Sequence, residues 1–193
     1  MSLSTSMALA SEHGFALWAA QGRILQGWAD AQQGQATRGI ALIRDGLAST
    51  EATGTRVSAP LFLTLLAEAL ALAEKIEEGL VALDEALAQA ASSGVRGWDA
   101  EIHRLRGELT ARLPHPDPAK AEGSFRTALA IAREQGTRGY ELRAAASLAR
   151  LRRDQGRHGE ARDLLAPVYG WFTEGFDTPD LKEAKALLDE LDA

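Results

Sequence analysis

AEALALAEKIEEGLVALDEAL, the stretch from Ala67 to Leu87, decides the fold because it holds two helical patterns joined by a short polar turn. In its second half, apolar and small residues recur at steps of three and four, which places them on one face of a helix. These residues are Ile76, Gly79, Leu80, Leu83, Ala86 and Leu87. Two short amphipathic helices cannot bury such a face alone, so they need similar neighbours stacked against them. The stretch therefore predicts one unit of a helical repeat.

The repeat is visible in the regular spacing of small and apolar residues along the chain. Four registers recur at a nearly constant interval, and all four share one short insertion in the same part of the chain. The registers are Gly14, Gly54, Gly94 and Gly136; Gly27, Ala67, Gly107 and Ala149; Gly39, Gly79, Ala121 and Ala161; and Leu47, Leu87, Leu129 and Tyr169. The insertion falls in the proline-rich segment 114–118, where Asp117 is expected to cap the next helix and Pro118 to begin it.

Each unit is expected to contain a first helix, a turn, a second helix and a loop. First helices are predicted at 15–33, 59–73, 98–112 and 139–154, and second helices at 35–52, 76–92, 119–134 and 158–170. We expect one domain over residues 1–193, with repeats at about 14–53, 54–93, 94–135 and 136–177. Residues 1–13 are expected to end a truncated preceding repeat, which would make the chain a fragment of a longer protein. Residues 178–193 are expected to form a capping helix.

Three glycines lie inside first helices, where glycine costs about 1 kcal/mol relative to alanine. They are Gly22, Gly27 and Gly107, and we expect each to allow close backbone contact. The capping helix is expected to start at Thr178 and Pro179, with Asp180 at the positive end of its dipole. Its apolar stripe is predicted to consist of Leu181, Ala184, Leu188 and Leu191.

Composition narrows the fold class and the function. Helix-forming Ala and Leu dominate the apolar residues and β-branched residues are few, which predicts an all-α protein. A formal charge of -6 argues against general nucleic-acid binding. The chain has no cysteine, which fits the cytoplasm and excludes thiolate chemistry. The uncharged run 57–67 is far shorter than the roughly 20 residues of a membrane span, and no basic segment marks a secretory signal.

The pattern resembles the tetratricopeptide repeat (TPR), a helix pair with small residues at its eighth, twentieth and twenty-seventh positions and a bulky one at its twenty-fourth. With Gly27, Ala67, Gly107 and Ala149 as the eighth positions, the twentieth are Gly39, Gly79, Ala121 and Ala161, and the twenty-fourth are Ile43, Leu83, Phe125 and Leu165. The twenty-seventh are Gly46, Ala86, Ala128 and, as a departure, Val168. The period, about 34 residues in the family, is about 40 here. The resemblance implies a right-handed superhelix of about four helix pairs with a capping helix.

A narrower resemblance covers nearly the whole chain. The phrases GWADAQQGQATRGIALIRDGL, HRLRGEL, AEGSFRTALAIAREQG and LLAPVYGWFTEGFDTPDLKEAKALLDEL are similar to the C-terminal repeats of bacterial adenylate/guanylate cyclase or ATPase-type multidomain proteins. Those proteins carry a class III cyclase domain, then a P-loop ATPase-type module, then the repeats. The resemblance implies a regulatory interaction domain in cyclic nucleotide signal transduction. It transfers no catalytic residue, because the cyclase and ATPase portions are not in this chain.

Motifs for nucleotide binding and catalysis are absent from the sequence. It contains neither a G-x-x-x-x-G-K-[ST] phosphate loop nor a G-x-G-x-x-G fingerprint. The histidines lack a second ligand type at zinc-site spacing; they are His13, His103, His115 and His158. Adjacent acids such as Asp84 and Glu85 diverge on a helix and cannot act as a catalytic pair. The sequence therefore predicts a chain without enzyme activity, cofactor or metal.

Basic residues gather at positions that line the concave groove of TPR domains, which the first helices form. By the family alignment, the candidate groove residues are Trp28, Arg104, Glu108, Arg112, Arg143, Arg150 and Arg153. Guanidinium groups on one face can bind the carboxylates of an acidic peptide, a protein C-terminus or upstream domains of the parent chain. Alternatively, Glu108 pairs with Arg104 and Arg112 at i±4, while Asp154 and Glu141 neutralise others, which leaves only a solvated face.

Two groups of aromatic residues are expected to pack in the core rather than to bind a ligand. Trp18, Trp98 and Tyr140 share one repeat position, and Trp171, Phe172 and Phe176 cluster just before the capping helix. For the second group, an exposed docking patch is the alternative. Two other functions stay open: a sensor that holds a small molecule inside the superhelix near Trp28 and Trp98, and self-association into a homo-oligomer through the N-terminal end.

Overall fold

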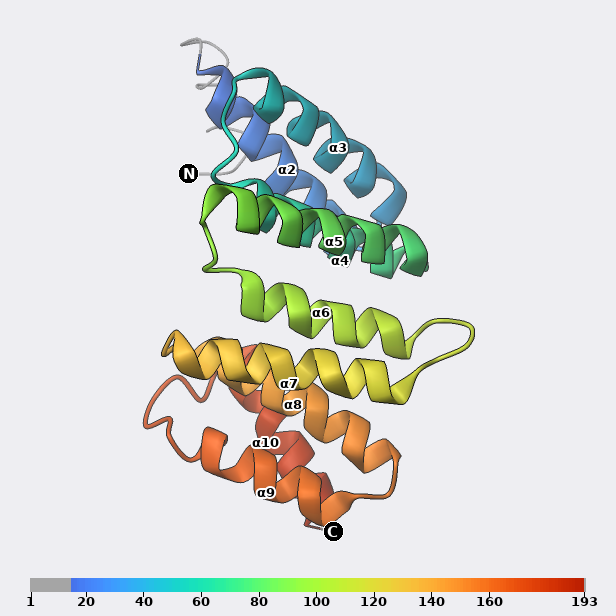
Figure 1. Ribbon diagram of the computed structural model, residues 1–193, viewed down its shortest axis with the longest axis vertical. Helices are drawn as coiled ribbons and strands as arrows, with labels where there is room; N and C mark the ends of the chain where they lie inside the picture. Colours follow the sequence, from blue (N-terminus) through green and yellow to red (C-terminus); the bar gives the residue numbers. More distant parts are fainter. Residues whose placement is uncertain (1–14, 193) are drawn as a thin grey trace. The chain divides into compact units, whose positions relative to one another are not determined.

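The computed structural model describes residues 15–192, and this part of the chain is all-α (Figure 1). Its helices are α2 (Ala16–Gln32), α3 (Ala36–Ala52), α4 (Ala59–Leu72), α5 (Ile76–Ser93), α6 (Asp99–Ala111), α7 (Pro118–Glu134), α8 (Arg138–Asp154), α9 (His158–Tyr169) and α10 (Pro179–Leu191). Every predicted end of α2 to α9 lies within one residue of the observed end. The truncated repeat expected at residues 1–13 lies outside the described residues. Among the described helices, none is long and apolar enough to cross a lipid bilayer.

Helix packing divides the chain into two compact units, the first ending at Trp98 and the second beginning at Asp99. In the first unit, α2 packs on α3 and α4 packs on α5, and α4 also contacts α2 and α3. In the second unit, α6 packs on α7 and α8 packs on α9, while α8 also contacts α6 and α7 (Figure 1). Within residues 15–192, four successive pairs therefore pack in the manner of TPR-like repeats. The single domain and the repeat boundaries stay predictions.

The two helices of a pair cross at the small residues of the repeat. All residues at its eighth, twentieth, twenty-fourth and twenty-seventh positions are buried. A Cβ atom added to Gly39 would lie 2.3 Å from the carbonyl oxygen of Gly27, which confirms the close backbone contact predicted there. At Gly107 the predicted backbone partner is wrong, because a Cβ would instead meet the ring of Phe125 at 2.5 Å. The bulky twenty-fourth residue fills the space between α6 and α7. Gly22 is also buried.

Glycines of the first register hold equivalent places in the structure. Gly54, Gly94 and Gly136 follow the second helix of their pair, with φ angles of +78°, +73° and +67°. This left-handed conformation ends a helix readily only where no Cβ is present. Their shared geometry confirms that the regular spacing of these glycines in the sequence reflects a structural repeat. Gly14 lies outside the described residues.

A second left-handed position follows the first helix of three of the pairs, and in one of these three it is not a glycine. Gly34 and Gly156 have φ of +85° and +74°, while Glu74, at the equivalent place, has φ of +57°. We expect Glu74→Gly to raise the free energy of unfolding by about 0.5–1 kcal/mol over Glu74→Ala, because only glycine adopts this conformation without steric cost. Urea denaturation of the two variants measures the difference. Equal stability of the glycine and alanine variants would contradict the prediction.

Helices α7 and α10 begin where the sequence predicts, but the predicted side-chain cap forms only at α7. The Asp117 carboxylate accepts a hydrogen bond from the backbone N–H of Lys120 at 3.1 Å, as expected for the N-cap of α7. At α10, Pro179 begins the helix as predicted, but the Thr178 hydroxyl donates to the Gly175 carbonyl instead of capping the helix. The N-terminus of α10 therefore lacks a side-chain cap from Thr178.

The capping helix α10 covers the end of the second unit by packing against α8 and α9. Its buried residues are Leu181, Ala184 and Leu187, while Leu188 and Leu191 are partly buried against the same core. The predicted stripe is therefore correct except that Leu187, rather than Leu188 or Leu191, is fully buried. The opposite face of α10 is polar and exposed, as in the terminal helices of repeat proteins.

The aromatic residues only partly follow the core prediction. Trp98 and Tyr140 are partly buried, but Trp18, at the same repeat position, is 64% exposed. In the other group, Phe172 packs against the core as expected, whereas Trp171 and Phe176 are 55% and 47% exposed. Their placement in the core was a wrong prediction.

Candidate functional site

The candidate site lies in the second unit, where three helices present charged side chains to one cavity. Helix periodicity puts Arg143 and Arg150 of α8 on one face, since their separation makes almost two turns, and puts Arg104 and Glu108 of α6 one turn apart. The cavity has a volume of about 260 Å³. Its lining consists of Arg104, Glu108, Leu142, Arg143, Ala146, Ser147, Arg150, Asp180 and Glu183. We call this cavity the arginine pocket.

A buried ion pair forms the floor of the arginine pocket. Arg104 is 6% exposed and Glu101 is 4% exposed. The Arg104 guanidinium donates to both carboxylate oxygens of Glu101, at 2.9 Å from Nε and 2.7 Å from Nη2. Its Nη1 donates to Glu108, and the Ser147 hydroxyl donates to the same Glu108 oxygen at 2.8 Å. This arrangement locks the orientation of Arg104 and ties α6 to α8.

These contacts determine the protonation state of Arg104 at the pocket floor. Burial lowers the pKa of the Arg104 guanidinium, but hydrogen bonds and the negative charges of Glu101 and Glu108 outweigh burial, so its pKa lies above the usual value. Arg143 adds a second cation to Glu101, with Nη1 at 2.9 Å from the carboxylate. Tyr140 lies close enough to Glu101 for burial and this negative charge to raise the pKa of its hydroxyl. Arg104 therefore stays protonated.

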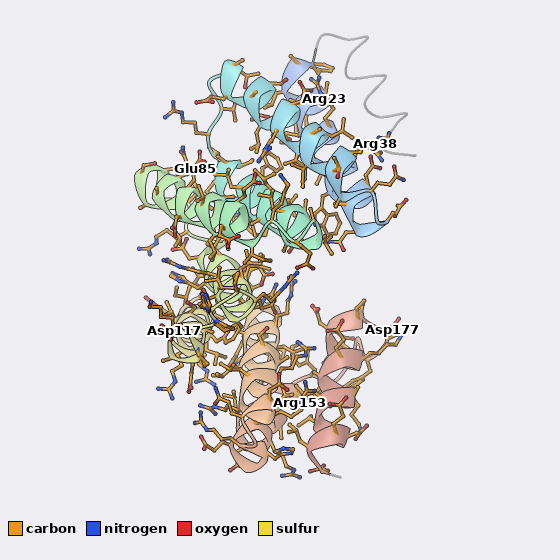
Figure 2. The ribbon with its side chains drawn as sticks, turned by 90° about the vertical axis from the view of Figure 1, so that its right-hand side faces the viewer. Arg23, Arg38, Glu85, Asp117, Arg153 and Asp177 are labelled. Atoms are coloured by element: carbon orange, nitrogen blue, oxygen red, sulfur yellow. The ribbon has the colours of Figure 1, made fainter. Side chains whose placement is uncertain are left out.

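Helix α10 supplies a row of carboxylates to the arginines of α8. Asp180 lies 3.8 Å from Arg143, Glu183 lies 2.9 Å from Arg150, and Glu190 lies 2.6 Å from Arg153. These residue numbers rise together along both helices, so α10 runs parallel to α8. Figure 2 shows Arg153 on the side of α8 that faces α10. The arginine face predicted from the sequence is therefore already paired with acidic groups of the same chain.

The structure brings four of the predicted groove residues together in one cavity. Arg104, Glu108, Arg143 and Arg150 line the arginine pocket. Arg153 lies farther along α8, where it contacts Asp154 and Glu190, and Arg112 is exposed just beyond the end of α6. Trp28 belongs to the first unit and is partly buried, and its indole Nε1 donates to Glu68 at 2.6 Å. Whether these residues bind a partner stays a prediction.

The sequence-based alternative of internal pairing also has support. Glu108 pairs with Arg104 and Asp154 pairs with Arg153, as that alternative predicts. Glu141 instead pairs with Arg133 and Arg138, which lie outside the candidate groove.

Four polar residues in or beside the pocket were not predicted as site residues: Glu101, Ser147, Asp180 and Glu183. For Glu101, one signal was present in the sequence, since it occupies the same repeat position that Arg143 holds in the next unit.

Two further cavities occupy equivalent positions in the second and fourth repeats. The first has a volume of about 60 Å³ and the second about 300 Å³. Residues that lie two repeats apart correspond between them: Glu51 and Arg133, Arg56 and Arg138, Ala59 and Glu141, Glu85 and Pro167, Gln89 and Trp171. In the fourth repeat, the Arg138 guanidinium lies over the ring of Trp171 at 5.1 Å. This cation–π contact holds an exposed tryptophan at the cavity edge.

Glu141, which lines this fourth-repeat cavity, is expected to make the stability of the protein depend on pH. Burial raises its pKa, but hydrogen bonds from Arg133 and Arg138 outweigh burial, so the pKa lies below 4.5. Because its pKa is lower in the folded state than in the unfolded state, ionised Glu141 contributes to stability above pH 4.5. That contribution is lost as the pH falls through the pKa of the folded state. We expect urea denaturation between pH 7 and pH 3 to show a smaller loss of stability in Glu141→Gln than in the wild type. An identical acid dependence of the two proteins would contradict this assignment.

The acidic and histidine side chains provide no metal centre in the part of the chain that the structure describes. No group of three or more His, Asp or Glu residues between 15 and 192 is arranged to hold a metal ion.

Comparison with known proteins identifies the fold but does not identify the function. No family model matches the sequence. An uncharacterized protein of Rhizobium meliloti (strain 1021) is 32% identical over 150 residues, which are 77% of this chain and 14% of that protein. The chain thus spans a small part of the relative's length.

Solved structures agree with the helix packing. The nearly identical TPR-like repeats of a Podosopora anserina kinesin light chain superpose with a TM-score of 0.66 at 17% identity, covering 89% of this chain and 84% of that chain. A point variant of the same protein gives a TM-score of 0.67 with the same identity and coverage. The chain has a TPR-like repeat fold. At this level of identity, the similarity concerns the fold alone.

Proposed function

We propose that the chain is a non-catalytic interaction module whose second unit binds an acidic segment of a protein partner. One observation carries the proposal: guanidinium groups from two neighbouring first helices, α6 and α8, converge on one cavity and bind carboxylates there. Arg143 and Arg150 are each about one-third exposed at the side chain, so a partner can reach them. Buried Arg104 fixes the floor of the pocket rather than contacting the partner directly.

The geometry sets the form of the acidic segment. Arg143 and Arg150 lie almost two turns apart on α8, which corresponds to about 10 Å along the helix axis. On a helix, carboxylates one to two turns apart can reach both arginines because the arginine side chains are long, as Asp180 and Glu183 of α10 do; on an extended peptide the separation is about three residues. The pocket lining holds three arginines and the acids Glu108, Asp180 and Glu183. Its formal charge is therefore balanced, and a partner must replace acidic groups that are already bound.

Peptide selection tests this proposal directly. Wild-type protein is used to select from a random peptide library displayed on phage, beside Arg143→Gln/Arg150→Gln and a control of equal charge change, Arg126→Gln/Arg162→Gln, on the second helices. We expect enrichment of peptides rich in Asp and Glu with the wild type and the control, and loss of that enrichment with Arg143→Gln/Arg150→Gln. Equal acidic enrichment with all three proteins would reject the arginine pocket as the binding site.

We propose further that the module is the C-terminal part of a cyclase/ATPase-type signalling protein. The resemblance of the quoted phrases supports this context, and a relative of which the chain covers 14% is compatible with additional domains. Binding of the partner would then bias the activity of the upstream domains. The complete coding sequence of the parent protein tests this context, because a class III cyclase domain and a P-loop must precede the repeats.

A further inference from the structure

We infer that the arginine pocket accepts an amphipathic acidic helix, and that α10 is an internal stand-in which competes with that partner for the surface of α8. The inference rests on the proposed function and specifies both the partner class and the regulation of its site. It differs from a simple capping role, because a cap needs only to cover apolar surface. Helix α10 also places acidic groups on the arginines that the proposed partner would use.

Charge complementarity between α8 and α10 is the first argument. Arg143, Arg150 and Arg153 meet Asp180, Glu183 and Glu190, respectively, along two parallel helices. Two of the three acids also line the arginine pocket. A carboxylate is the group that a guanidinium recognises best, and a row of three fixes the direction of the bound helix. Helix α10 thus shows the chemistry that this surface selects.

Apolar burial is the second argument, and it defines the rest of the partner. Leu181, Ala184 and Leu187 of α10 are buried in the core of the second unit. An occupant that replaced α10 without such residues would leave this apolar surface in water. Counting Asp180 as the first position, the partner helix therefore needs acids at positions one, four and eleven and apolar residues at positions two, five and eight. An extended acidic peptide satisfies only half of this pattern.

The weakness of the ion pairs that hold α10 is the third argument. Each acidic partner on α10 is more than half exposed at the side chain, so solvent screens its ion pair and the contribution to stability is small. A helix of 13 residues is marginal by itself in water, and the Thr178 hydroxyl does not cap this one. The loop 170–178 joins α10 to α9 and contains Gly175 with a φ of +77°. Exchange of α10 for a similar helix is therefore physically accessible.

The test uses a fluorescein-labelled synthetic peptide, TPDLKEAKALLDELD, which reproduces residues 178–192. Fluorescence anisotropy measures its dissociation constant on the full chain of the wild type, of Asp180→Asn/Glu183→Gln, and of the control Asp177→Asn/Asp189→Asn. The control removes the same charge from acids that lie outside the lining of the arginine pocket. We expect the first variant to bind the peptide about tenfold more tightly than the wild type and the control, which corresponds to about 1.4 kcal/mol. A peptide with the two Asn and Gln replacements is expected to bind more weakly to that variant.

The outcomes separate this inference from the proposed function. Far-UV circular dichroism and urea denaturation first establish that each variant is folded. If the wild type and both variants bind the peptide equally, and Arg143→Gln/Arg150→Gln abolishes that binding, the arginine pocket stands as a site but competition by α10 is rejected. If the folded Asp180→Asn/Glu183→Gln variant does not bind the peptide, the inference is overturned. If it binds tightly and the arginine substitutions have no effect, the peptide occupies another surface and the inference also falls.

Discussion

Arg104→Ala is expected to lower the free energy of unfolding of the second unit by about 3–5 kcal/mol, the largest effect that we expect of any single substitution in this protein. Arg104 and Glu101 are both almost completely buried, and the guanidinium forms two hydrogen bonds with the carboxylate. Without Arg104, Glu101 stays in the interior with Arg143 as its remaining cation. The large cost arises because a buried charge loses its partner, rather than because the ion pair itself strongly favours folding.

Two controls separate this mechanism from a general loss of positive charge. Arg153→Ala also removes an ion-paired arginine, but one whose side chain is 32% exposed, and it is expected to cost less than about 1 kcal/mol. The double variant Glu101→Gln/Arg104→Met removes both charges, and we expect it to recover most of the stability, since no unpaired charge is left in the interior. Urea denaturation followed by circular dichroism gives all three values. A cost below about 1 kcal/mol for Arg104→Ala would show that water reaches Glu101.

Helix boundaries were predictable from the sequence because their physical causes are local. Steps of three and four residues mark the buried face, and left-handed glycines mark where second helices end. The close contact of Gly27 with Gly39 was also predictable, because glycine inside a helix is costly unless another helix must approach it. The gathering of Arg104, Glu108, Arg143 and Arg150 followed from the repeat register, which assigns each of them to the same face of a first helix.

Contacts and exposures that the repeat pattern does not determine could not be predicted from the sequence in the same way. Helix α10 has no register position, so nothing in the sequence specified that Asp180 and Glu183 face the arginines of α8. The exposure of Trp18 was missed because it shares its repeat position with Trp98 and Tyr140, which are partly buried, and a shared repeat position does not fix the exposure of each member. Trp171 was missed because its partner, Arg138, lies at the start of α8, in a different element and far from Trp171 along the chain.

Gly39→Ala is expected to lower the free energy of unfolding of the first unit by about 2–3 kcal/mol, although alanine is the better helix former. The added Cβ would lie 2.3 Å from the carbonyl oxygen of Gly27 and 2.9 Å from the Cβ of Ala31. Both obstacles are held rigidly on α2, so the clash is relieved only if α2 and α3 separate. Separation would also loosen the contact of Gly46 with Ile24, farther along the same crossing. The packing cost therefore exceeds the gain of about 1 kcal/mol in helix propensity.

Gly123→Ala is the matched control, and its expected sign is opposite. Gly123 lies inside α7, is exposed, and has no atom within 4 Å of the position of an added Cβ. The same substitution there should raise the free energy of unfolding by about 0.5–1 kcal/mol, because only the backbone propensity changes. Urea denaturation of both variants compares a glycine that contacts another helix with one that does not. If Gly39→Ala were also stabilising, the α2–α3 crossing would tolerate a wider separation, and close backbone approach would not explain the small residues of the repeat.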